Sequence, residues 1–118
     1  MAKIAENIPD SRSYFRIVWK ITAAGNDTPN TTPLPLVLYK RVLYVVCENF
    51  SGTFTLYRGI FIDERGSVAW DTELSATLND GSLIIREIPV PAHFYYPSLN
   101  PASGYTGPIL VWVQLEGV

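Results

Sequence analysis

Apolar and polar side chains alternate over residues 13–23, and this pattern limits the possible fold more than any other feature of the chain. Phe15, Ile17, Trp19 and Ile21 fall on one side, whereas Arg16, Lys20 and other polar residues fall on the other. A period of two residues is that of a β-strand with one face buried and one face in water. We therefore predict a half-buried strand of an antiparallel sheet.

Further strand-like segments follow, rich in β-branched and aromatic residues and separated by turn residues. They lie at 36–48, 53–62, 67–71, 73–78, 82–88 and 109–116. The first is either two strands or one strand with a bulge near Lys40. In 53–62 the expected core face carries Phe54, Leu56, Ile60 and Ile62. Asp-Glu-Arg-Gly at 63–66 and Asn-Asp-Gly at 79–81 predict hairpin turns, so that 82–88 pairs back on the preceding strand.

These segments predict an all-β domain. A chain of 118 residues forms one domain with a sizeable core, and about eight strands without a helix-period segment indicate two antiparallel sheets packed face to face. We expect an antiparallel β-sandwich of about eight strands, of jelly-roll type. A small β-barrel is the second choice.

All nine prolines lie outside the predicted strands, as expected of a residue that cannot donate to a β-ladder. Their positions predict a single domain over 1–118 with an N-terminal arm (1–12) and two long Pro-rich loops (24–35 and 89–108). Loops of this length are usually functional or are ordered by a partner. The first is either an arm laid along a neighbour or an exposed loop.

The segment 88–115 contains no Asp, Glu, Lys or Arg over 28 residues, yet it is rich in aromatic residues. Aromatic enrichment with loss of charge is typical of the core of a protein–protein interface, and proline reduces the entropy lost on docking. We therefore predict a partner interface formed by Pro91, His93, Phe94, Tyr95, Tyr96, Pro97, Leu99, Pro101, Tyr105 and Pro108. Alternatively, the loop folds back and covers the chain's own sheet. Tyr95→Ser and Tyr96→Ser would separate these readings, because an interface role predicts lost assembly rather than lost stability.

Charge and cysteine content exclude several classes of partner. The net charge of −2 and the pI of about 5.2 argue against nucleic acid and anionic membranes. No apolar run approaches the roughly 20 residues of a membrane span, and the first residues lack the apolar region of a signal peptide. Cys47, the single cysteine, lies in an apolar run typical of a buried thiol.

No arrangement of catalytic or metal-binding residues stands out. His93 has no acidic residue near it in sequence, and one Cys with one His cannot form a Cys/His zinc site. The acidic residues of the turns lack the spacing of a calcium loop, and no Gly-rich phosphate loop occurs. We predict a non-enzyme with no catalytic residue, no metal and no cofactor. Trp70 and Trp112 are either sheet-packing residues, the favoured interpretation, or platforms for a sugar.

In its length, its β content, its N-terminal arm at 1–12 and its long loop at 89–108, the chain resembles small β-structured bacteriophage virion proteins. These include head decoration (cement) proteins and tail or fibre subunits. The resemblance is one of general character rather than motif, so it transfers no functional residue. It implies a structural subunit of the virion, made in the host cytoplasm, that self-associates or binds a major capsid or tail subunit. The alternative is a carbohydrate-binding or receptor-recognition β-sandwich module.

Overall fold

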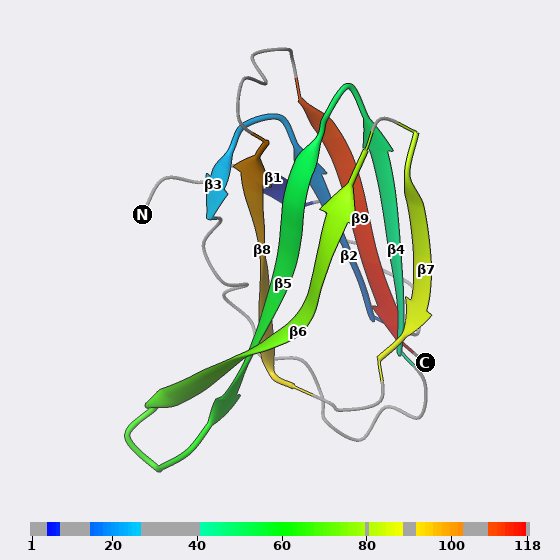
Figure 1. The fold of residues 1–118 in the computed structure, drawn as a ribbon. Coiled ribbons are helices and arrows are strands. Elements are labelled where there is room, and N and C mark those ends of the chain that lie inside the picture. The colour runs from blue at the N-terminus through cyan, green and yellow to red at the C-terminus, as the bar shows by residue number, and fades with distance from the viewer. Residues whose placement is uncertain are drawn as a thin grey trace.

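The computed structural model describes residues 5–7, 15–26, 41–79, 81–88, 92–102 and 109–117 (Figure 1). Within these ranges the chain forms strands and no helix. The strands are β1 (Ala5–Asn7), β2 (Phe15–Ile21), β3 (Gly25–Asn26), β4 (Arg41–Glu48), β5 (Gly52–Phe61), β6 (Val68–Leu78), β7 (Leu83–Glu87), β8 (Phe94–Pro101) and β9 (Leu110–Gly117).

The described strands form two antiparallel sheets that pack face to face. The five-stranded sheet has the order β1-β2-β9-β4-β7, and the four-stranded sheet has the order β3-β8-β5-β6. Each sheet ends in edge strands, so the architecture is an open sandwich rather than a closed barrel. The prediction of an all-β antiparallel sandwich is confirmed.

The order of pairing defines a jelly roll. From β2 onwards the first strand pairs with the last (β2 with β9), the second with the second-last (β3 with β8), and so on inward through β4 with β7 to β5 with β6. The chain is thus one long hairpin whose paired halves are wrapped so that successive pairs alternate between the two sheets. The second half of the chain in this way completes both sheets begun by the first.

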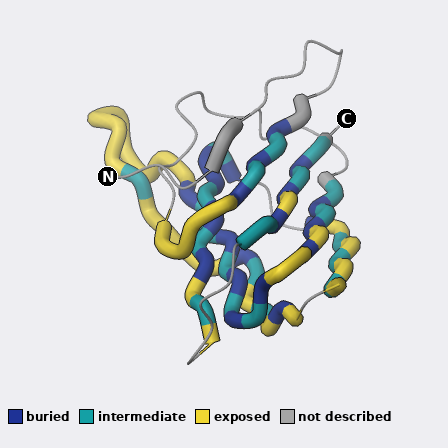
Figure 2. Tube along the Cα trace, turned by 90° about the horizontal axis from the view of Figure 1, so that it is seen from above, coloured by how far each residue is buried: buried dark blue, intermediate teal, exposed yellow. Residues whose placement is uncertain are grey.

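The core lies between the inner faces of the sheets, where alternate residues of each strand are buried (Figure 2). Trp19 pairs across the ladder with Val113, which pairs in turn with Val45, and all three are buried. Cys47 is also buried, as predicted, and its thiol donates to the carbonyl oxygen of Phe50. The predicted core face of the 13–23 segment is therefore confirmed at residues 17, 19 and 21.

The turn at 79–81 does not close a hairpin, so that prediction is wrong. β7 pairs with β4 in the opposite sheet rather than with β6. The backbone N–H of Gly81 donates to the carbonyl of Cys47, and the N–H of Cys47 donates to the carbonyl of Ser82. These bonds dock the chain onto β4 as it leaves the turn. Because the chain crosses between sheets here, β6 and β7 are both left as edge strands.

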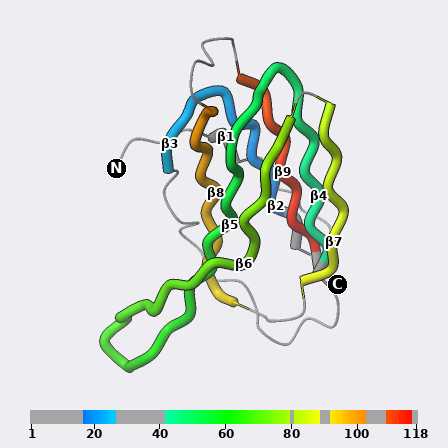
Figure 3. Tube along the Cα trace, viewed as in Figure 1, coloured from blue at the N-terminus to red at the C-terminus, as the bar shows by residue number. Residues whose placement is uncertain are grey.

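A β-bulge redirects the hairpin formed by β5 and β6. Leu56 pairs with Leu74 whereas Tyr57 pairs with Thr72, so Glu73 is an extra residue on β6. The predicted strands at 67–71 and 73–78 are therefore one bulged strand. Beyond the bulge the two strands run past the ends of their neighbours and project from the sandwich (Figures 1 and 3).

The projection explains two errors of core assignment. Ile60 and Ile62, expected on the core face, are exposed because no opposing sheet covers the hairpin at this point.

The predicted turn of this hairpin at 63–66 is confirmed. The N–H of Ile62 donates to the carbonyl of Ser67, and Gly66 adopts φ +87°, which glycine accepts at little cost.

The predicted loop at 89–108 contains strand β8, so that boundary is also wrong. Pro97 and Pro101 lie within the strand. β8 pairs with β3 only at residues 98 and 99, so both prolines lie where the strand has a described neighbour on one side alone. A proline nitrogen can then point away from the ladder. Within the 24–35 loop, residues 25 and 26 form β3, and within the 1–12 arm, residues 5–7 form β1. The other residues of these two segments, apart from residue 24, lie outside the described ranges.

Candidate functional site

The outer face of the four-stranded sheet carries no charged side chain among its described residues. Pairing partners in a ladder share a face, and alternate residues of a strand point the same way. The three charged residues of these strands, Arg58, Asp71 and Glu73, lie on the opposite side. The outer face is formed by Asn26, Thr53, Thr55, Tyr57, Gly59, Phe61, Val68, Trp70, Thr72, Ser75, Thr77, Phe94, Tyr96, Ser98 and Asn100.

Five aromatic side chains and a histidine gather at one end of this face, where the hairpin leaves the sandwich. Tyr57 and Tyr96 are stacked with ring centroids 4.7 Å apart, and the Trp70 ring meets Tyr96 edge-on at 5.2 Å. Phe61 packs edge-on against Phe94 at 5.0 Å. We call Tyr57, Phe61, Trp70, His93, Phe94 and Tyr96 the aromatic cluster.

His93 joins the cluster through both its ring and its backbone. Its ring centroid lies 5.0 Å from that of Phe61, and its Nδ1 accepts a hydrogen bond from the backbone N–H of Phe61 at 3.4 Å. The backbone N–H of His93 donates to the carbonyl of Gly59. The histidine therefore fastens the start of β8 to the projecting part of β5.

Polar side chains occupy the rest of the outer face. The hydroxyls of Thr55 and Ser75 lie 3.5 Å apart, and the hydroxyl of Ser98 donates to the side-chain oxygen of Asn26. Burial raises the pKa of the Tyr96 hydroxyl, and the nearby Tyr57 raises it further, so the Tyr96 hydroxyl remains neutral in the physiological range. The described residues of this face thus present aromatic, hydroxyl and amide groups without ionic ones.

The hairpin beside the cluster is apolar and exposed. Ile60, Phe61, Ile62 and Trp70 are among the large hydrophobic side chains most open to solvent, with Ile62 61% and Trp70 43% exposed. Acidic and basic residues are confined to its tip at 63–65, where Asp63 accepts hydrogen bonds from the backbone N–H groups of Arg65 and Ser67. The tip is thus a hydrogen-bonded turn, and the rest of the hairpin presents a hydrophobic surface.

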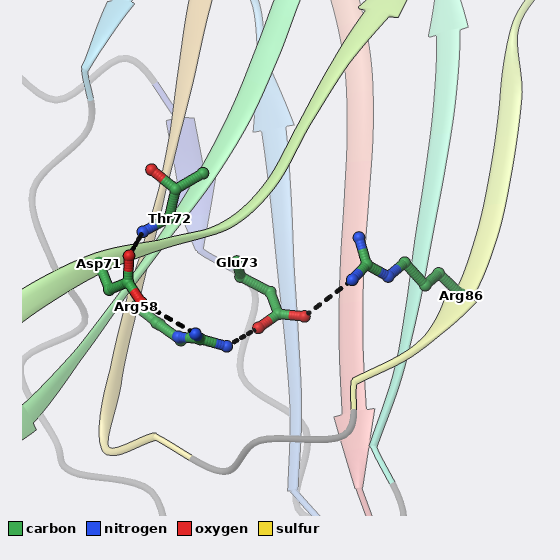
Figure 4. A network of polar contacts seen from close by, with 5 residues as sticks. All are labelled: Arg58, Asp71, Thr72, Glu73 and Arg86. Atoms are coloured by element: carbon green, nitrogen blue, oxygen red, sulfur yellow. Dashed lines mark hydrogen bonds and ion pairs between the residues drawn. The ribbon is translucent and has the colours of Figure 1, made fainter.

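An ion-pair network holds the base of the hairpin on the inner side (Figure 4). The carboxylate of Glu73, brought inward by the bulge, is almost completely buried and pairs with Arg58 of the neighbouring strand. Its other oxygen, Oε1, accepts no hydrogen bond within the described structure but lies 3.6 Å from Nη2 of Arg86 on β7. Glu73 thus connects the edge strand of one sheet to that of the other.

Asp71 completes the network at the surface. Nη2 of Arg58 donates to Asp71 at 2.9 Å, and this hydrogen bond is the largest influence lowering the pKa of the Asp71 carboxyl. Burial alone would lower the pKa of Arg58, but the two carboxylates raise it on balance. The Arg58 guanidinium therefore stays charged between two carboxylate acceptors and holds β5 to β6.

The seven predicted interface residues that the structure describes divide into three groups. His93, Phe94 and Tyr96 belong to the aromatic cluster. Tyr95, Pro97 and Leu99 of β8 point inward and are buried in the protein's own core. Pro101 is half-buried at the end of β8. The remaining three, Pro91, Tyr105 and Pro108, lie outside the described residues.

Sequence reasoning missed the hairpin as part of the site. Ile60 and Ile62 alternate with the same period as core residues, so the pattern alone assigns them to the core. Trp70 and Trp112 are each partly exposed, at 43% and 36%. Trp70 packs against Phe94 and Tyr96, and Trp112 lies beneath the Lys20 ammonium, 5.7 Å from its ring centroid.

The described residues contain no group of His, Cys, Asp and Glu side chains placed to hold a metal ion. Over the same residues, no helix is long and apolar enough to cross a membrane.

Comparisons with known proteins find likenesses among solved structures. No protein-family model matches the chain, and no curated protein does. A cupin domain from Bordetella pertussis is similar at 16% identity, with 100% of this chain and 98% of that chain covered and a TM-score of 0.43. Peruvianin-I, a cysteine peptidase from the latex of Thevetia peruviana, is similar at 15% identity, with 88% and 50% covered and a TM-score of 0.37. The strand pairing defines an all-β jelly-roll fold, and its aromatic face carries no charged side chain among the described residues.

Proposed function

We propose that this protein is a non-enzymatic structural subunit of a larger assembly, most simply a bacteriophage virion accessory protein such as a capsid decoration or tail component. The observation that carries the proposal is the projecting hairpin with the aromatic cluster at its base. In the isolated chain, an apolar hairpin that extends beyond its own sandwich leaves hydrophobic side chains in water. A partner protein would bury them. The occupant we infer is another protein with an uncharged, apolar groove.

Energetic magnitudes favour a broad contact over a small one. Burying one large apolar side chain contributes about 1.5–3 kcal/mol, and those of the hairpin are already about half covered, so four of them supply on the order of 3–6 kcal/mol. Association costs about 4–15 kcal/mol. The hairpin alone is therefore insufficient, and the uncharged face beside it has to join the contact.

Co-expression with the products of neighbouring genes, followed by mass measurement of the purified particle, tests the proposal. The wild-type chain is expected in the particle at a fixed copy number. The Ile60→Ser/Ile62→Ser double variant is expected to fold with an unchanged melting temperature but to be lost from the particle. The matched control, Thr53→Ser/Thr77→Ser, alters the far end of the same sheet and is expected to assemble normally. A monomer that joins no particle with any neighbouring product would contradict the proposal.

The polar part of the outer face favours one second candidate, a carbohydrate-binding or receptor-recognition module. Hydroxyl and amide side chains lie beside aromatic rings on an uncharged surface, which suits a neutral sugar chain. Tyr57 and Tyr96 cover one face of each other's ring, however, which reduces the area open for stacking. Titration with neutral oligosaccharides separates the candidates: a sugar module changes its tryptophan emission in the wild type but not in Trp70→Ala, and an assembly subunit changes it in neither.

A further inference from the structure

The exposed large hydrophobic side chains of the described residues form two groups on opposite sheets. One is the hairpin already described. The other lies on the outer face of the five-stranded sheet, towards edge strand β7, where Leu83 and Ile85 are 63% and 62% exposed. Val46 pairs with Leu83 and with Trp112, so apolar side chains continue inward from the edge across β4 to β9.

Along β7, the residues whose backbone hydrogen-bonding groups have no partner among the described strands are the ones that carry these side chains. Ser82 accepts a hydrogen bond from Cys47 on β4, so its carbonyl points toward β4. Backbone groups in an antiparallel strand alternate in direction, and those of Leu83 and Ile85 therefore point away from β4. No described strand pairs with this side of β7.

Three of the features that protect edge strands are missing from β7. Many natural edges are blocked by lysine, proline or a bulge. The five residues of β7 include none of these. Its single basic residue, Arg86, is directed toward the buried carboxylate of Glu73 instead (Figure 4).

We propose that β7 pairs antiparallel with β7 of a second copy of this chain, about a two-fold axis at Ile84. In this register Leu83 of each copy faces Ile85 of the other, so all four exposed side chains meet on one face. Arg86 faces Ser82, and Glu87 faces Gly81, so no like charges oppose each other. An axis at Ile85 would instead place Leu83 against the Glu87 carboxylate, which is less favourable.

The pairing joins two five-stranded sheets into one continuous sheet of the dimer. A two-fold contact is self-complementary by symmetry, because the same strand supplies both sides. The apolar residues behind the edge, Val46 and Trp112, flank the joint in both copies. The inference adds a second copy to the partners of the proposed function, but it uses the sheet opposite the hairpin and can fail without it.

Disulfide trapping of the purified chain tests the register directly. At a non-hydrogen-bonded antiparallel pair the two Cα atoms lie about 4.5 Å apart, which is within the range of a disulfide. Ile84→Cys is therefore expected to form a covalent dimer on mild oxidation, since the native Cys47 is buried. The control Thr77→Cys, on edge strand β6 of the other sheet, is expected to stay monomeric. A monomeric Ile84→Cys variant overturns the proposal.

Sedimentation of an uncrosslinked variant gives an independent readout. Ile85→Lys alters an exposed side chain and is expected to keep the fold, but in the proposed dimer it would set an ammonium group against Leu83 of the second copy. The dimer dissociation constant is expected to rise by about tenfold or more. An unchanged constant overturns β7 as the joint. The hairpin variant Ile60→Ser/Ile62→Ser is expected to dimerise as the wild type does, which distinguishes failure of this inference from failure of the proposed function.

Discussion

Trp70 lies directly over Gly59: the two residues pair across β5 and β6, and a Cβ atom added at Gly59 would stand 2.6 Å from Cζ3 of the indole. The bare backbone at residue 59 leaves the indole room to lie close to the sheet and reach Phe94 and Tyr96. One glycine thus determines the shape of the aromatic cluster, and with it the base of the projecting hairpin.

Gly59→Ala is therefore expected to displace the Trp70 ring and to disturb the cluster. The added methyl would also crowd Cγ1 of Val68 at 2.7 Å, and overpacking of this kind costs about 1–3 kcal/mol. Near-ultraviolet circular dichroism and tryptophan emission should both change, and denaturant unfolding should show the loss of stability. Thr55→Ala serves as the control, because Thr55 lies on the same outer face of the sheet but outside the aromatic cluster. Wild-type spectra in Gly59→Ala would contradict the contact.

Glu73→Ala is expected to destabilise the protein far more than Asp71→Ala, although both carboxylates pair with the same arginine. Glu73 is buried and bridges the two sheets through Arg58 and Arg86, so its removal leaves a partly buried guanidinium without its inner partner. Loss of one partner of a buried pair costs about 3–5 kcal/mol, and the partial exposure of both arginines places the expected value near 2–3 kcal/mol. Urea unfolding of the two variants measures the difference, and equal midpoints would refute the bridging role.

Stability is expected to fall on acidification in a way that depends on Asp63 and Asp71. The hydroxyl of Ser67 lowers the pKa of Asp63, and the hydrogen bond from Arg58 lowers that of Asp71. A carboxyl whose pKa is lower in the folded state contributes stability above its unfolded pKa of about 3.9 and loses it as the pH falls through the folded pKa. Urea midpoints measured from pH 6 to pH 2 should therefore decline less steeply in Asp63→Asn/Asp71→Asn than in the wild type. Identical slopes would exclude these two groups.

Tyr95→Ser and Tyr96→Ser are expected to have opposite effects although the residues are adjacent. Tyr95 is fully buried in the core, so its truncation should cost about 3–5 kcal/mol, as for other large aromatic residues. Tyr96 lies on the outer face, so its truncation should cost less stability but more assembly. Melting temperature and incorporation into the co-expressed particle, measured together, check both expectations. A large stability loss in both variants would assign Tyr96 to the core as well.

The all-β sandwich could be predicted from sequence because half-buried strands carry a period of two, and β2 and β9 show it clearly. The crossing from β6 to β7 could not, because Asp-Gly turns connect strands within a sheet or between sheets with the same local chemistry. Strand β8 could not be predicted from the sequence either, because of its prolines. Pro97 and Pro101 normally argue against a strand, and only the short pairing with β3 leaves room for them.

The candidate site was partly visible in the sequence, as the long segment without charges. That pattern contains Phe94 and Tyr96 of the aromatic cluster but could not separate them from the buried Tyr95, because it ignores which face of a strand each residue occupies. Ile60 and Ile62 were assigned to the core because their period is that of core residues. They are exposed because the bulge at Glu73 directs that part of the hairpin away from the sandwich. The sequence contains no local motif that predicts this bulge.

Hydroxyl-radical footprinting of Trp70 and Trp112, in the free chain and in the co-expressed particle, tests most directly whether another polypeptide completes the aromatic face. Both indoles are partly exposed in the free chain, but they lie on opposite sheets, so each serves as the reference for the other. The account predicts a severalfold loss of labelling at Trp70 on assembly, with Trp112 much less affected. Equal labelling of Trp70 in the free and assembled protein would contradict it.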